Sequence, residues 1–127
     1  MINTKDLLEK LSNAHGISGH EDNIRNIIEY IITPFVDEIT IDQMGNLIGT
    51  KHGNGPTIML AAHMDEIGLM VKYIDDKGFI YFTQSGGWFS QTLLNQRMVL
   101  HTEKGDIYGV IGCKPPHVMN VSDRTKV

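Results

Sequence analysis

The fold is decided by the stretch Thr57-Ile58-Met59-Leu60-Ala61-Ala62-His63-Met64-Asp65, in which a nearly unbroken apolar run ends at a histidine and an aspartate. Turn residues at positions 53–56 precede the run. A short apolar run after a turn is typical of a central strand that is buried on both faces. In open α/β sheets, functional groups gather where strands end at their carboxyl edge. The stretch therefore predicts an α/β fold with a candidate site at His63 and Asp65.

Two amphipathic helices are predicted upstream of this strand. The first covers residues 4–13, where leucines lie on one face and Thr4 is a candidate N-cap. The second covers residues 24–31, where isoleucines recur at helical spacing. Ser18 and Glu21 precede the second helix at the spacing of a capping box, in which each side chain satisfies a backbone amide at the helix start.

Short strands are predicted from alternation and from turn residues. Pro34 disfavours helical geometry at the residue before it and should end the second helix. Beyond it, residues 38–48 alternate around a central Met44-Gly45-Asn46 turn and predict a β-hairpin. Four further strands are predicted, at residues 69–74, 79–84, 97–101 and 107–112. The pattern thus changes near residue 70 from α/β to all-β, which predicts a boundary between residues 1–70 and residues 71–127.

The composition is that of an ordinary folded domain. Hydrophobic residues make up 41% and charged residues 20% of the 127 residues. The net charge is -4, and no basic run could follow a phosphate backbone, so nucleic acid is not an expected partner. No apolar run approaches the length of a membrane span, and the N-terminus lacks the apolar core of a signal peptide. Neither a membrane nor export is therefore expected.

Cys113 is the single cysteine of the sequence. It cannot form an internal disulfide, and a lone thiol fits a reducing compartment, so a cytoplasmic location is predicted. No histidine or asparagine around it forms a recognisable nucleophile signature. We interpret Cys113 as a small buried structural residue.

His63 and Asp65 can form a unit because strand side chains alternate, which directs both to the same side. A neutral imidazole is a good zinc ligand, and a carboxylate that takes the proton on its other nitrogen fixes the tautomer and raises its basicity. The alternative is a hydrogen-bonded histidine at a strand end with a turn aspartate, which the tripeptide alone favours. The other histidines lie in loops or at element ends and are interpreted as solvated.

Several ordered stretches of the chain form a pattern: Gly16-Ile17-Ser18-Gly19-His20-Glu21, Asp42-Gln43-Met44-Gly45-Asn46-Leu47, Ala61-Ala62-His63-Met64-Asp65-Glu66-Ile67-Gly68, and Gly86-Gly87-Trp88 with Lys114-Pro115-Pro116-His117. These stretches resemble those of peptidase family M42, the tetrahedral-type cytoplasmic aminopeptidases, some of which are labelled endoglucanases. The third stretch is the specific one. Because the four stretches also match the family in order and spacing, we interpret His63 as a metal ligand.

The resemblance implies that His63 is the first metal ligand and that Asp65 is the active-site aspartate that supports it. Residues 1–70 would form the N-terminal part of a catalytic α/β metallopeptidase domain, and residues 71–127 part of an inserted PDZ-like β-barrel domain for dimerisation and assembly. In such enzymes two divalent ions, zinc or cobalt, polarise the scissile carbonyl and lower the pKa of a bridging water, while a glutamate serves as general base. The implied partners are peptide substrates and further copies of the chain in a homo-oligomer.

By the same resemblance, the remaining ligands and the general-base glutamate lie in a stretch beyond the inserted domain, whereas this chain stops at Val127. One histidine cannot hold a metal pair against water, so we expect the 127-residue chain alone to bind no metal stably and to be inactive. Strands missing beside residues 57–62 would leave apolar surface uncovered and favour self-association.

The alternative hypothesis is a non-catalytic β-rich binding or oligomerisation module. Glycoside hydrolysis needs two opposed carboxylates in a cleft, and no spacing in the sequence suggests such a pair.

Overall fold

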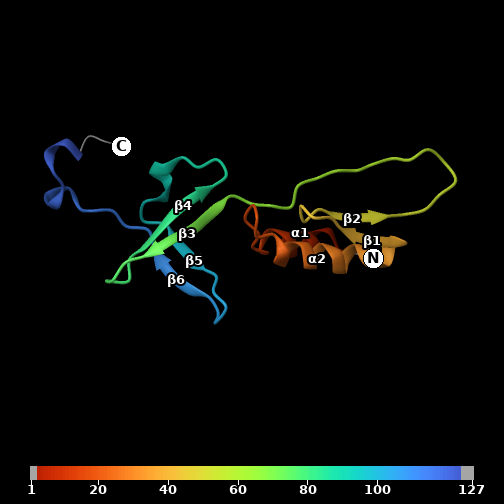
Figure 1. The fold of residues 1–127 in the computed structure, drawn as a ribbon, viewed down its shortest axis with the longest axis horizontal. Coiled ribbons are helices and arrows are strands. Elements are labelled where there is room, and N and C mark those ends of the chain that lie inside the picture. The colour runs from red at the N-terminus through yellow and green to blue at the C-terminus, as the bar shows by residue number, and fades with distance from the viewer. Residues whose placement is uncertain (1–2, 124–127) are drawn as a thin grey trace. The chain divides into compact units, whose positions relative to one another are not determined.

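The computed structural model describes residues 3–123 and divides into two compact units, with the division between Gly87 and Trp88. The first unit contains α1 (Thr4–Ser12), α2 (Asp22–Ile32), a 3-10 turn (Thr33–Phe35), β1 (Glu38–Ile41), β2 (Leu47–Thr50), β3 (Gly68–Ile74) and β4 (Ile80–Ser85) (Figure 1). The second contains a 3-10 turn (Ser90–Leu93), β5 (Arg97–Leu100), β6 (Ile107–Val110) and two further 3-10 turns (Pro116–Val118 and Val121–Asp123). The predicted boundary near residue 70 refers to the domains of the metallopeptidase that the sequence resemblance implies, and it stays a prediction.

Both predicted helices are present, but their N-caps are not the predicted ones. The side chain of Asn3, not Thr4, accepts a hydrogen bond from the Lys5 amide and caps α1. The capping box of Ser18 and Glu21 is also wrong, because α2 begins at Asp22 with Glu21 in the N-cap position. Glu21 instead accepts a hydrogen bond from the Gly19 amide at 2.7 Å, which closes the loop before the helix.

The predicted strands form three antiparallel hairpins, each a separate two-stranded sheet. β1 pairs with β2, β3 with β4, and β5 with β6. The ladder of β3 and β4 is irregular between Val71 and Tyr73, and beyond the irregularity Tyr73 stacks on Tyr81 with ring centroids 4.3 Å apart. Local turn chemistry explains these pairings, because the left-handed backbone needed at each tight turn falls on glycine, as at Gly45 and Gly78.

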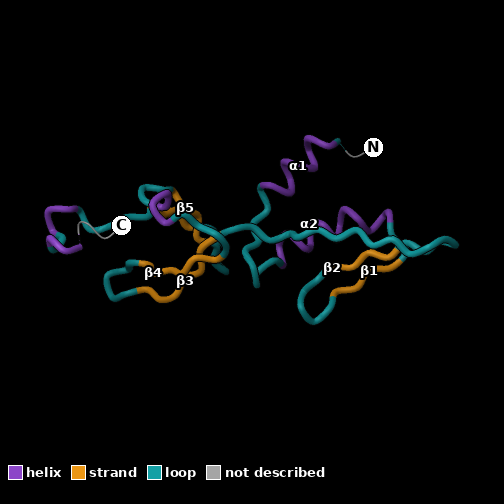
Figure 2. Tube along the Cα trace, turned by 90° about the horizontal axis from the view of Figure 1, so that it is seen from above, coloured by secondary structure: helices purple, strands orange, loops and turns teal. Residues whose placement is uncertain are grey.

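The central strand predicted at residues 57–62 is not formed. Residues 51–65 run as an extended segment between β2 and β3, drawn as loop in Figure 2, and pair with no strand of the described chain. Ile58, Met59 and Leu60 are 80%, 84% and 94% exposed. A strand exists only through hydrogen bonds to neighbouring strands, and the described residues supply none beside this run. The exposed apolar run agrees with the expectation that its surface would be uncovered.

The buried core of the described residues is small. Its hydrophobic members are Ile24 of α2 in the first unit and Leu93 in the second. Cys113 is exposed, so its interpretation as a buried residue is wrong. Residues 3–123 include no helix that is both long and apolar enough to cross a membrane.

The close approach of Gly68 to Ile17 predicts a measurable loss of stability on substitution. A Cβ atom at Gly68 would lie 2.1 Å from Cγ2 and 3.3 Å from Cβ of Ile17. Ile17 is β-branched and cannot turn its methyl group aside freely. We expect Gly68→Ala to lower the free energy of unfolding by about 1–3 kcal/mol, as overpacking does.

Urea unfolding followed by helical circular dichroism measures this loss. Gly53→Ala is the matched control, because nothing lies within 4 Å of a Cβ atom at Gly53. Equal stability of the two variants would contradict the packing described here.

Candidate functional site

His63 and Asp65 contact each other at the end of the extended segment. Nδ1 of His63 lies 3.0 Å from Oδ1 of Asp65 and 3.1 Å from the Asp65 backbone oxygen. The His63 side chain is 86% exposed and that of Asp65 is 39% exposed. Both oxygens can only accept, so Nδ1 donates to them, and in the neutral tautomer that fits this contact the lone pair lies on Nε2. This is the state in which an imidazole binds a metal ion through Nε2.

A small cavity of about 130 Å³ adjoins this pair. It is lined by Glu21, by residues 44–46 and by residues 62–65. Pockets that enclose a whole organic ligand are several times larger, roughly 300–1,000 Å³. The cavity therefore has room for ions or water beside His63 and Asp65 but is too small to enclose a whole organic ligand.

The turn between β1 and β2 is held rigidly against this cavity by Asp42. Its Oδ1 accepts hydrogen bonds from the amides of Met44 and Asn46, both at 2.9 Å, and its Oδ2 accepts one from the Asn46 side chain at 2.8 Å. These hydrogen bonds hold the pKa of Asp42 below its usual value of 3.8, and the hydrogen bond from the Asn46 side chain contributes most to this shift. From α2, the guanidinium of Arg25 also donates to the Gly45 carbonyl at 3.5 Å.

Glu66 joins the loop before α2 to the segment that carries His63 and Asp65. Its backbone amide donates to the Gly16 carbonyl at 2.8 Å, and its Oε1 accepts from the Gly16 amide at 3.2 Å. Ile17 and Glu66 form an isolated parallel bridge. Two stretches that resemble peptidase family M42 are therefore in direct contact.

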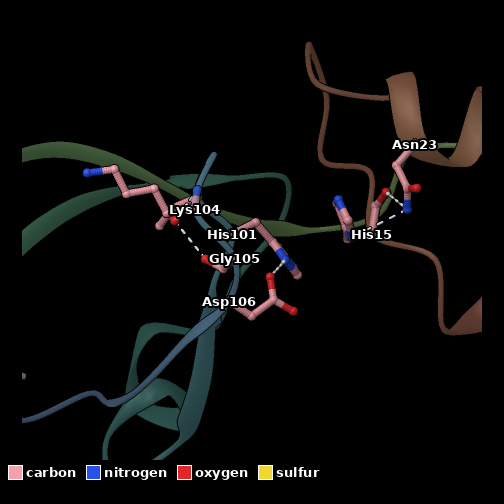
Figure 3. Close-up of polar contacts among 7 residues, drawn as sticks. His15, Asn23, His101, Lys104, Gly105 and Asp106 are labelled. Atoms are coloured by element: carbon pink, nitrogen blue, oxygen red, sulfur yellow. Dashed lines mark hydrogen bonds and ion pairs between the residues drawn. The ribbon is translucent and has the colours of Figure 1, made fainter.

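His15 and His101 contact polar side chains, whereas the sequence interpretation described them as solvated. In the first unit, the Asn23 side chain lies 3.3 Å from Nδ1 of His15 (Figure 3). In the second unit, Nδ1 of His101 lies 2.8 Å from Oδ1 of Asp106, and both side chains are about half exposed (Figure 3). Within residues 3–123, neither pair belongs to a group of three or more histidine, cysteine, aspartate or glutamate side chains that could hold a metal ion.

The donor groups fit one corner of a metal centre. A histidine with a supporting carboxylate is a common element of zinc sites. Within residues 3–123, however, no group of three or more histidine, cysteine, aspartate or glutamate side chains could hold a metal ion. His63 and Asp65 can therefore contribute to such a centre but cannot form it from the described residues alone.

Solved structures of aminopeptidases share this fold. The chain matches a TET aminopeptidase from a Thaumarchaeota archaeon with a TM-score of 0.88 and 37% identity, covering 98% of this chain and 35% of that one. It matches the TET1 peptidase of Pyrococcus horikoshii with a TM-score of 0.82 and 36% identity, covering 98% and 38%. The fold is thus one that aminopeptidases of the TET class contain.

The family follows from the sequence comparisons. The family model described as M42 glutamyl aminopeptidase matches residues 45–127. The lysyl aminopeptidase of Pyrococcus furiosus is 42% identical over 114 residues, which is 89% of this chain and 33% of that protein. The chain belongs to peptidase family M42, as the sequence resemblance indicates. It spans about a third of the length of the curated relatives that it matches.

Sequence reasoning placed His63 and Asp65 together but missed the residues that surround them. The Asp42 side chain accepts hydrogen bonds from the backbone amides two and four positions further along the chain. The first of these is typical of an Asx turn. That signal is present in the sequence and could have identified the turn that Asp42 organises. The contact of Glu66 with Gly16 spans 50 residues and has no such local signal.

The lowered pKa of Asp42 predicts an acid transition of the turn at residues 42–46. A carboxylate with a lowered folded-state pKa adds stability that is fully present above its unfolded pKa of about 3.8 and is lost as the pH falls through its lower folded value. We therefore expect the Met44 and Asn46 amide resonances to titrate with a midpoint below 3.8. Two-dimensional NMR during acid titration measures it.

Asp42→Ala should remove this titration and disorder the turn, whereas the control Asp76→Ala, in the turn between β3 and β4, should leave it intact. A midpoint at or above 3.8 in the unsubstituted chain would refute the assignment.

Proposed function

We propose that this chain supplies one wall of the active site of a metal-dependent aminopeptidase, which removes N-terminal residues from peptides. The single observation that carries the proposal is the contact between His63 Nδ1 and Asp65 Oδ1 at 3.0 Å. It leaves an exposed Nε2 beside the cavity, in the setting of a chain that belongs to peptidase family M42. The relatives named above are aminopeptidases, which supports the same reaction here.

His63 and Asp65 have separate tasks in this proposal. His63 binds one ion of a metal pair through Nε2. Asp65 accepts the Nδ1 proton, which fixes the ring tautomer, restricts the ring orientation and raises the basicity of Nε2. Zinc or cobalt ions bound in such a pair supply Lewis-acid polarisation of the scissile carbonyl and activate water for attack on the peptide bond. A cytoplasmic location is part of the proposal, supported by the free Cys113 thiol.

The remaining ligands are proposed to come from the part of an M42 protein that this chain does not cover. Two divalent ions need several carboxylate and imidazole ligands, and one histidine with one carboxylate is too few. The uncovered apolar run at residues 57–62 supports the same division, since neighbouring strands from that part would bury it. Residues 1–127 alone are therefore expected to lack peptidase activity.

A chimera tests the assignment of His63 and Asp65. Residues 1–127 would replace the matching region of the Pyrococcus furiosus lysyl aminopeptidase, and hydrolysis of aminoacyl-arylamides would be measured with zinc or cobalt. We expect the chimera to be active and the 127-residue chain alone to be inactive. Asp65→Asn should lower metal affinity or activity by about 10–100-fold, as loss of a ligand's supporting carboxylate does. His63→Ala should lower activity further.

His52→Ala is the matched control, because His52 is exposed in the loop after β2 and does not line the cavity. Full activity of a correctly folded His63→Ala chimera would refute the metal-ligand assignment. Activity of the 127-residue chain alone would refute the expectation that further ligands are required.

We also propose that residues 1–70 belong to a catalytic α/β domain and residues 71–127 to a PDZ-like β-barrel domain for assembly. The support is the apolar surface of β6, where Tyr108 and Val110 are 80% and 68% exposed. The Pyrococcus horikoshii TET1 peptidase is described as assembling into a tetrahedron or an octahedral shell. Exposed apolar patches of this kind mark association surfaces. The alternative function, a non-catalytic β-rich oligomerisation module, rests on the same surface.

Multi-angle light scattering tests the association role of β6. The chain should self-associate above its monomer mass of 14.2 kDa, and the double substitution Tyr108→Ser and Val110→Ser should shift it toward the monomer. Glu103→Ser, at the exposed turn between β5 and β6, is the control. An unchanged mass in the double variant would refute association through β6. Defined oligomers together with an inactive chimera would favour the non-catalytic alternative.

A further inference from the structure

We propose that Glu66 is a positioning residue that holds the loop before α2 against the His63–Asp65 segment. It thereby fixes one wall of the cavity beside His63 and Asp65. This loop, residues 16–21, is called the clamped loop below. The proposal deepens the proposed function and rests on it for the catalytic consequence. The clamp itself rests only on the geometry of the first unit.

The contact with Glu66 works through both its backbone and its side chain. Gly16 donates its amide to Oε1 of Glu66 at 3.2 Å and accepts the Glu66 amide on its carbonyl oxygen at 2.8 Å. Because both the amide and the carbonyl of Gly16 are hydrogen-bonded to Glu66, the position and the orientation of Gly16 relative to Glu66 are fixed. The parallel bridge of Ile17 to Glu66 extends the same contact by one residue.

Close packing leaves little freedom for the clamped loop to shift. A Cβ atom at Gly16 would lie 2.5 Å from Cγ2 of Ile24, and Ile24 is 4% exposed. On the other side of the contact, Gly68 approaches Ile17 closely, as described above. Gly16 and Gly68 therefore each pack against an isoleucine side chain where a Cβ atom does not fit, and the hydrogen bonds of Glu66 select one register of the two segments.

The far end of the clamped loop reaches the cavity. Glu21 accepts the Gly19 amide at 2.7 Å, which closes the loop, and Glu21 lines the cavity together with His63 and Asp65. Glu66 follows Asp65 directly in the chain, so a fixed Glu66 also restricts where the Asp65 carboxylate can lie. Loss of the clamp should let the cavity wall and the His63–Asp65 pair move independently.

Amide hydrogen exchange and imidazole NMR of the 127-residue chain test the clamp without any activity. Glu66→Ala should speed exchange of the Gly16 amide by about tenfold, as expected for loss of one hydrogen bond to a charged group. It should also shift the His63 ring nitrogen resonances. Glu66→Gln keeps a side-chain oxygen acceptor and should restore both readouts. Glu9→Ala, on the exposed surface of α1, is the control and should change neither.

Two results of these exchange and NMR measurements would overturn the proposal. Unchanged Gly16 exchange in Glu66→Ala would mean that the side chain is no clamp. Faster exchange with unmoved His63 resonances would mean that the clamp is purely structural and positions nothing at the site.

Kinetics of the chimera then test the catalytic consequence. Glu66→Ala should lower kcat severalfold with KM nearly unchanged, because the misplaced wall affects the reacting groups more than peptide binding. Glu66→Gln should restore kcat. A kcat equal to that of the unsubstituted chimera would overturn the positioning role. An unsubstituted chimera that is itself inactive would count against the proposed function, while the NMR result would still decide the clamp.

Discussion

The pairing of Gly16 and Ile17 with Glu66 is the contact on which the candidate site depends. It joins segments 50 residues apart in the chain. The segment at residues 51–65 forms no ladder that could fix its position by itself. The register of His63 and Asp65 against the helices is therefore set where Glu66 meets the loop before α2. Hydrogen bonds that satisfy both backbone groups of Gly16, next to a glycine–isoleucine contact without room for a Cβ atom, make that register specific.

In the proposed function, the candidate site is one part of a larger functional arrangement. Asp65 contacts Nδ1 of His63, and the turn organised by Asp42 lines another side of the cavity. The exposed imidazole and the exposed apolar run beside it have one physical explanation. In the proposed function, the imidazole gains free energy by binding a metal ion, and the apolar run gains it from neighbouring strands that cover it. The described residues provide neither the other ligands of such an ion nor those strands.

Local signals in the sequence predicted the local structure well. The hairpins follow from alternation and glycine turns, and the contact of His63 with Asp65 follows from the alternation of an extended segment. Predictions failed where distant partners decide. The run at residues 57–62 has the composition of a buried strand, but strand formation requires neighbours. The capping box is an exception, because it failed for a local reason: α2 begins at Asp22, and the Glu21 side chain accepts the Gly19 amide of its own loop.

In the proposed site, His63 binds metal through Nε2 while Asp65 holds Nδ1. Anomalous X-ray diffraction at the zinc or cobalt edge, from crystals of the metal-loaded chimera, locates the metal ion relative to both residues. We expect a metal ion about 2.0–2.1 Å from Nε2 of His63, as in zinc–imidazole bonds, with Asp65 still within hydrogen-bond distance of Nδ1. A metal centre formed without His63, or bound through Nδ1 with Asp65 displaced, would contradict the proposed site.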